Sequence, residues 1–216
     1  DNIAIGYQAM VTDTAGGTAN VAVGNYALDA LTSGDYNVAV GQGALGANNT
    51  GSRNTAIGYT ALYTNTTGEY NTASGREALY TNSTGEYNTG IGYQALLANT
   101  TAGYNTGIGQ SALRTNTTGA NNTAVGTQAL YGNTTASFNC ALGDGALYTN
   151  STGANNVAVG RIALYNNTTA DNNTAVGYAA LTANTTGSEN TAVGQNSLQA
   201  NTTASDNVGV GHSALE

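Results

Sequence analysis

Residues 54–70 read NTAIGYTALYTNTTGEY, and this stretch of 17 residues recurs along nearly the whole chain. Its opening phrase, Asn-x-Ala/Gly-x-Gly, begins thirteen times in 216 residues; the first two copies are 18 residues apart and all later neighbours are 17 apart. A short fixed period is the signature of a solenoid, in which each repeat forms one coil. We therefore expect a single domain over residues 1–216. Its roughly 12.5 repeats begin at Asn2, Asn20, Asn37, Asn54, Asn71, Asn88, Asn105, Asn122, Asn139, Asn156, Asn173, Asn190 and Asn207.

The pattern inside one repeat favours short strands over helices. Thr-Ala-Ile at 55–57 and Thr-Ala-Leu-Tyr at 60–63 are two strand-like segments joined at Gly58, and an Asn/Thr/Gly run then turns the chain back. No window shows sustained 3.6-residue periodicity. The sequence therefore predicts an all-β fold, a parallel β-solenoid (β-roll) of 17-residue coils. Twelve such coils would be roughly 58 Å tall at the usual spacing of strands.

Two positions of the repeat are almost always large and apolar. Counting from the Asn, position 4 is Ile, Val or Leu in every copy except Ser74, and position 9 is Leu in every copy except Met10. We expect both positions to stack from coil to coil as ladders of the core. Ser74 and the extra residue before Asn20 are then expected to be local defects. The predicted core ladders include Ile57, Leu62, Ile91, Leu96, Val125, Leu130, Val159 and Leu164.

Glycine and asparagine also recur at fixed positions of the repeat. Position 5 is Gly in every copy, which predicts either a φ that only Gly adopts cheaply or the close approach of another backbone. Asn at positions 1 and 12 tolerates turn geometry, and its amides can bond along the axis from coil to coil. The predicted turn and ladder residues include Gly58, Gly92, Gly126, Asn65, Asn99 and Asn133.

The predicted core is narrow, so we expect several copies to pack side by side. The small residues at positions 3, 5 and 8 would permit close contact between copies. The net charge of −8, with twelve acids, four arginines and no lysine, argues against nucleic acid as a partner. No apolar run is long enough to insert into a membrane. The chain begins at Asp1 and ends at Glu216 within a repeat, so we expect it to be a segment of a longer protein.

The phrases NTAVG, NVAVG and NIAIG, followed two residues later by a small residue and Leu or Met, resemble the head repeats of trimeric autotransporter adhesins. They resemble still more the NTAVGYQAL…NTTG arrays of phage tail-fibre-type proteins; residues 173–187 read NTAVGYAALTANTTG. The resemblance covers essentially all of the chain. It implies a left-handed homotrimeric β-roll that serves as the shaft or head of an extracellular, cell-surface or virion fibre. It also implies attachment to a cell-surface glycan or receptor through a region outside this segment.

Few residues suit chemistry. His212 and Cys140 are each the only residue of their type, and the acids are scattered over several positions of the repeat. The Asp-containing repeat of calcium-binding β-rolls is absent. We therefore expect no enzyme, and no catalytic, metal or cofactor site.

Two surface features leave other functions open. Position 10 carries an aromatic stripe, which either covers coil edges and seams between chains or binds sugar. The stripe consists of Tyr63, Tyr80, Tyr131, Tyr148 and Tyr165. Thr-x-Thr steps such as 64–66 resemble ice-binding arrays but are interrupted in over half the coils, and Asn-Thr-Thr also matches the N-glycosylation acceptor. The alternatives are thus a self-assembling extracellular filament and an ice-binding or glycan-binding solenoid.

Overall fold

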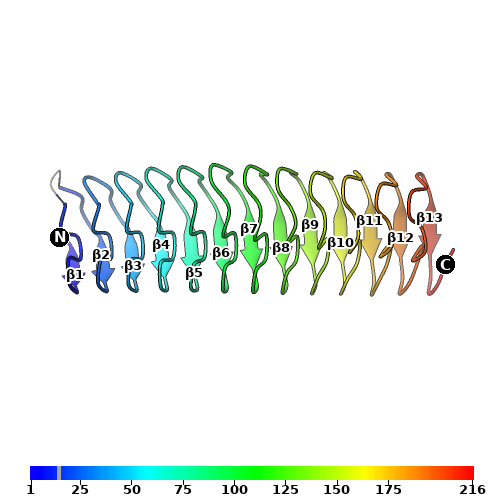
Figure 1. Cartoon of the computed structure of the whole chain (residues 1–216), viewed down its shortest axis with the longest axis horizontal. Coiled ribbons are helices and arrows are strands. Elements are labelled where there is room, and N and C mark those ends of the chain that lie inside the picture. Colours follow the sequence, from blue (N-terminus) through cyan, green and yellow to red (C-terminus); the bar gives the residue numbers. More distant parts are fainter. Residues whose placement is uncertain (14–15) are drawn as a thin grey trace. The chain divides into compact units, whose positions relative to one another are not determined.

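The computed structural model describes residues 1–13 and 16–216 and divides into two compact units, Asp1–Asn105 and Thr106–Glu216. Each unit is a parallel β-solenoid with a 17-residue repeat, which confirms that part of the expected fold, and the described residues contain no helix. In Figure 1 each coil contributes one short arrow, and the rest of the coil loops back to the next arrow.

Every strand has three residues, and within each unit neighbouring strands pair in parallel through the same positions of their coils, as Ala56 does with Ala39 and Ala73. Unit 1 contains β1 (Ile3–Ile5), β2 (Val21–Val23), β3 (Val38–Val40), β4 (Thr55–Ile57), β5 (Thr72–Ser74) and β6 (Thr89–Ile91). Unit 2 contains β7 (Thr106–Ile108), β8 (Thr123–Val125), β9 (Cys140–Leu142), β10 (Val157–Val159), β11 (Thr174–Val176), β12 (Thr191–Val193) and β13 (Val208–Val210).

The strands point their large side chains away from the core, which makes the prediction for position 4 wrong. Successive residues of a strand face opposite sides. The central Ala56 is fully buried, and its neighbour Ile57 is therefore on the outside, with 45% of its surface exposed. Ile91 is likewise exposed, and Val125 and Val159 are only half-buried.

The second expected strand-like segment, residues 60–63, is a run of turns instead of a strand. The sign of φ alternates along this segment, and φ is positive at Thr60 (47°) and at Leu62 (51°). This alternation turns both Ala61 and Leu62 inward, where both are fully buried. The inward row of position 9 includes the fully buried Leu62, Leu96, Leu130 and Leu164.

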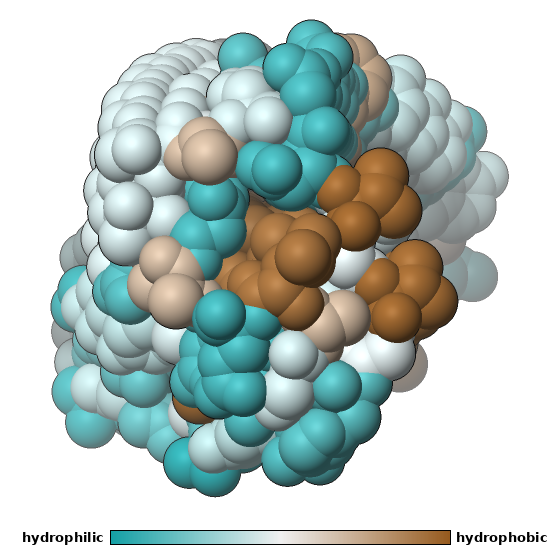
Figure 2. Space-filling view, turned by 90° about the vertical axis from the view of Figure 1, so that its right-hand side faces the viewer, coloured by the Kyte–Doolittle hydropathy of each residue, from teal (hydrophilic) through white to brown (hydrophobic). Residues whose placement is uncertain are grey.

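The core is therefore built from Ala at positions 3 and 8, Leu at position 9, and Asn at positions 1 and 12. Because Ala56 and Ala61 are inside, the expected contact between copies through positions 3 and 8 is also wrong. Figure 2 faces the last coil of unit 2: brown apolar side chains gather in the middle of this face and toward one edge, surrounded mainly by polar ones.

Neither of the two expected local defects disturbs the described core or the pairing of the strands. Ser74 lies on the outer face of β5, half-buried, so it leaves no gap in the core. The first coil keeps its register despite the extra residue, since Ile3 pairs with Val21. That coil includes residues 14 and 15, which lie outside the described part of the chain.

The two apolar positions are expected to differ strongly in their contribution to stability. Leu62→Ala removes a fully buried side chain from the middle of a ladder and should lower the free energy of unfolding by about 2–5 kcal/mol. Ile57→Ala removes a side chain that is almost half exposed and should cost about 1 kcal/mol or less. Urea unfolding followed by circular dichroism measures both, and equal losses would contradict the assignment of the core.

Candidate binding surface

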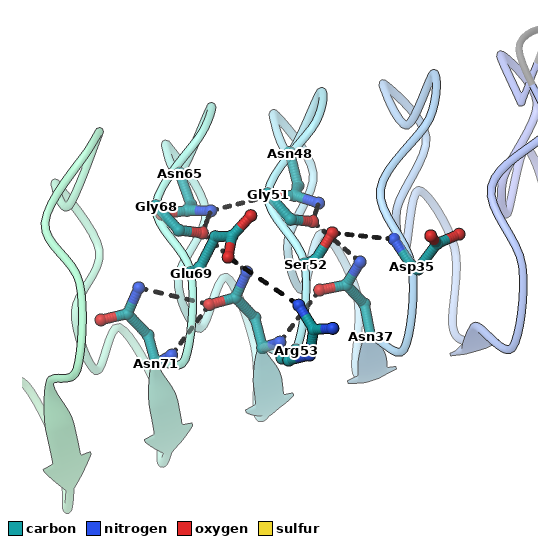
Figure 3. Close-up of polar contacts among 11 residues, drawn as sticks. Asp35, Asn37, Asn48, Gly51, Ser52, Arg53, Asn65, Gly68, Glu69 and Asn71 are labelled. Atoms are coloured by element: carbon teal, nitrogen blue, oxygen red, sulfur yellow. Dashed lines mark hydrogen bonds and ion pairs between the residues drawn. The ribbon is translucent and has the colours of Figure 1, made fainter.

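The asparagines of the repeat are structural groups of the interior (Figure 3). Asn65 Nδ2 donates to Gly68 O of its own coil (3.0 Å) and to Asn48 Oδ1 of the preceding coil (2.7 Å). Asn54 Nδ2 donates to the same Gly68 oxygen (2.8 Å), and Asn54 Oδ1 accepts from the backbone N–H of Asn71 (2.9 Å). These coils are thus tied to their neighbours through two buried amides; the first two coils have Asp13 and Leu31 at position 12 and lack the second amide. Asn99 and Asn133 make the corresponding bonds in their own coils.

The glycine of position 5 has both an unusual φ and a close backbone neighbour, the two causes that the sequence suggests. At Gly58 φ is +138°, outside the range of ordinary side chains, and Gly92 and Gly126 have φ of 128° and 136°. A Cβ on Gly58 would lie 2.6 Å from the backbone oxygen of Gly75 in the next coil. The position therefore serves the stacking of coils and presents no group to a ligand.

The tyrosines of position 10 form two stacks, one in each unit. Tyr63 and Tyr80 stack with ring centroids 5.5 Å apart, and Tyr131, Tyr148 and Tyr165 stack at 5.1 and 4.9 Å. The planes of neighbouring rings are within 10° of parallel. Since each ring covers a face of its neighbour, the stripe offers a ligand mainly ring edges and hydroxyl groups. This arrangement favours a structural role for the stripe.

A longer stack runs along position 17 of unit 1. Tyr70, Tyr87 and Tyr104 stack at 4.8 and 5.0 Å, and the guanidinium of Arg53 lies 5.3 Å from the ring of Tyr70 and 5.6 Å from that of Tyr36. Burial raises the pKa of the Tyr87 phenol, and the neighbouring phenols raise it further. The places of Tyr36 and Arg53 in this stack are absent from the sequence prediction, although the shared position 17 was the signal that would have found them.

The threonines of the turn bond along the axis. Thr64 Oγ1 donates to Tyr80 O (2.9 Å) and Thr66 Oγ1 donates to Ser83 O (3.0 Å), so these hydroxyls already have partners. Position 14 carries an exposed Thr in every coil from Thr50 to Thr203. The Asn of the Asn-Thr-Thr acceptors is buried up to Asn184, as Asn65 is completely, so these amides are not accessible for glycosylation in the folded chain, whereas Asn201 is only half-buried.

Open grooves lie beside the aromatic stripe, along positions 6, 7 and 10. In unit 1, grooves of about 480 and 410 Å³ share Tyr59, Thr60 and Tyr80. In unit 2, a groove of about 330 Å³ is lined by Gly145 and Tyr165 among others. Burial raises the pKa of Asp29, which lines the 410 Å³ groove. These grooves combine aromatic, amide, hydroxyl and carboxylate groups, a combination suited to binding a polar molecule.

The two residues singled out for their chemistry lie apart from these grooves. Cys140 is half-buried on the outer face of β9, and His212 is exposed after β13. Among the described residues, no three His, Cys, Asp or Glu side chains come together as a metal site. None of the described segments is a helix long and apolar enough to cross a membrane.

Comparison with known proteins gives no match: no family model matches the chain, and neither a curated protein nor a solved structure is significantly similar to it. The resemblance to phage tail-fibre-type and adhesin-head repeats therefore stays a prediction from the sequence.

Proposed function

We propose that this chain is a structural, non-enzymatic rod that forms the shaft or head of a phage tail fibre or bacterial surface adhesin. In this role it holds an attachment site for a cell surface at a distance. The observation that supports the proposal most is the axial bonding of each coil, through backbone pairs and buried amides such as those of Asn54 and Asn65, which suits a load-bearing element. An extracellular or virion location and a left-handed coil belong to the same proposal.

Several copies of the chain pack side by side in this proposal, as a homotrimer. The outer face of the strands is the surface best suited to that contact. Positions 2 and 4 carry no charged residue in any coil, although the chain as a whole has a net charge of −8. In each unit the face displays exposed aliphatic side chains, which often mark interaction surfaces. These include Ile57 and Ile91 in unit 1, and Leu142, Val176 and Val193 in unit 2.

The mass of the folded chain in solution tests this assembly. Light scattering should give three times the chain mass of 21.5 kDa. Ile57→Asp places a charge on the outer face and should dissociate the copies without unfolding the coil, because the side chain is already almost half exposed. Thr67→Asp, on the exposed turn, is the matched control and should leave the mass unchanged. A stable, folded monomer of the unaltered chain would contradict the proposal.

The alternatives of a self-assembling filament and an ice-binding solenoid stay predictions. The unbroken exposed row of Thr at position 14 is the surface on which an ice-binding role would rest. Glycan binding has a more specific basis, because it can be tied to one groove.

A further inference from the structure

One coil of unit 1 lacks side chains where its neighbours have them. Residues 37–53 read NVAVGQGALGANNTGSR, and both position 7 (Gly43) and position 10 (Gly46) are glycine. The 410 Å³ groove lies beside these glycines, and we call it the notch. The side chains that border it come from this coil, the preceding one and the two that follow: Tyr26, Asp29, Gln42, Tyr59, Thr60, Tyr63 and Tyr80.

Both glycines are buried, but a side chain would fit more easily at Gly43 than at Gly46. A Cβ on Gly43 would meet nothing closer than Thr60 Cγ2, at 3.4 Å, an ordinary contact. A Cβ on Gly46 would lie 2.7 Å from the ring of Tyr63, so this ring leans over the glycine. The groove that Gly43 lines extends from Tyr26 of the preceding coil to Thr60 and Tyr63 of the following one.

The groups around the notch are both aromatic and hydrogen-bonding. Tyr26 and Tyr59 are 39% and 49% exposed. The carboxylate of Asp29 and the amide of Gln42 supply acceptors and donors. Thr60 Oγ1 is buried and has no hydrogen-bond partner within the described part of the chain. Rotation of this side chain toward the groove would let the hydroxyl bond to a ligand.

We propose that this notch binds one unit of a neutral carbohydrate chain. Sugar hydroxyls can donate to the Asp29 carboxylate and exchange bonds with Gln42 and Thr60, while the apolar C–H surface of the sugar packs on the tyrosines. The carboxylate and the net negative charge of the protein disfavour an anionic glycan. A cation gains little at Tyr59, because the guanidinium of Arg76 already lies 5.7 Å from that ring.

The size of the notch agrees with this ligand. Its volume of about 410 Å³ lies within the usual range for small-molecule sites. The 480 Å³ groove continues from it along the coils through Tyr59, Thr60 and Tyr80, so further sugar units have room beside the first. The site lies within unit 1 and requires no second copy, so it does not depend on the proposed fibre role.

Titration with neutral tetrasaccharides tests the site. We would use the full chain with maltotetraose, cellotetraose, mannotetraose and chitotetraose, followed by calorimetry and saturation-transfer NMR. At least one should bind in the millimolar range, at one site per chain. A heparin-derived tetrasaccharide and trilysine should not bind.

Gly46→Tyr is the decisive variant, because position 10 accepts Tyr in other coils. The Tyr63 ring, 2.7 Å from the new Cβ, would have to swing back, and the two rings could then stack as Tyr63 and Tyr80 do at 5.5 Å and occupy the notch. Binding should weaken by more than about tenfold, while the melting temperature stays the same or rises. Gln199→Tyr adds the same side chain at the same position of the repeat in unit 2, at a residue that does not line the notch, and should leave binding unchanged.

Asp29→Asn keeps the shape of the notch and should also weaken binding. This second variant tests the site even if Gly46→Tyr folds poorly. The proposal is overturned if none of the neutral tetrasaccharides binds, if binding survives in both variants, or if trilysine or the heparin fragment binds instead. Light scattering on the same samples reports separately on the assembly of copies, so the two proposals can fail independently.

Discussion

Replacing Gly58 with alanine is expected to lower the free energy of unfolding by about 3 kcal/mol or more. Two effects add at this position. The φ of +138° lies in a region that L side chains rarely adopt, and the new Cβ would lie 2.6 Å from the Gly75 oxygen and 2.7 Å from its carbonyl carbon. Both contacts are with backbone of the next coil, which cannot move aside without breaking the pairing of the strands.

Gly43→Ala is the matched control. Gly43 also has a positive φ, +66°, but a Cβ there meets only side-chain atoms at 3.4 Å or more. Its cost should be about 1 kcal/mol, the usual penalty for an L-residue in the left-handed region. Urea unfolding of both variants measures the difference. Similar losses would mean that backbone conformation alone, and not the close approach of coils, explains the glycine of position 5.

Asn65→Asp is expected to cost about 3–5 kcal/mol at pH 7, since it places an uncompensated charge in the interior. Asn65 is completely buried, and its Nδ2 donates to the oxygens of Asn48 and Gly68. A carboxylate has no proton to donate, so its oxygen would face two acceptors. Protonation restores one donor, and the penalty should therefore be smaller in acid.

The direction of the pH dependence follows from the same burial. Burial raises the pKa of the new carboxyl in the folded state above its unfolded value of about 3.9. The folded variant then holds more protons than the unfolded one, so its stability relative to the unaltered chain falls as the pH rises from the unfolded pKa to the folded pKa. Chemical unfolding at pH 4 and pH 7 measures this change.

Thr67→Asp is the control for the added charge, because Thr67 is exposed on the turn. It should have a small effect that varies little between the two pH values. If Asn65→Asp behaves like this control, the buried amide ladder contributes little to stability and the interpretation of position 12 is wrong.

The sequence predicts the repeat better than it predicts the cross-section of the coil. The period of 17 correctly predicts stacked parallel coils, because one pairing register satisfies every copy at once. It does not tell which side of the strand Thr55–Ile57 faces inward, since Ala56 and Ile57 are both apolar. Size suggests Ile57, but the interior already holds Leu62 and two Asn rows and accommodates only the methyl group of Ala56 there.

The candidate binding surface, too, can be predicted from the sequence only in part. The period predicts which tyrosines of position 10 adjoin each other, and Tyr131, Tyr148 and Tyr165 indeed stack. The turn brings positions 6, 7 and 10 to one groove because its residues alternate between positive φ, as at Thr60, and negative φ. No strand or helix periodicity contains this alternation, so the notch at Gly43 could not be located from the sequence.

The repeat, the register, the glycine of position 5 and the rows of Asn and Leu can therefore be predicted from the amino-acid sequence. These features depend on residue type and spacing, which the translation from one coil to the next preserves. The direction of each side chain, the groove at the notch and the outward placement of the uncharged positions 2 and 4 depend instead on how the coil folds. The reason is that the path of the backbone within one coil is set by turn conformations, and residues as different as Thr60 and Leu62 adopt the same left-handed conformation there.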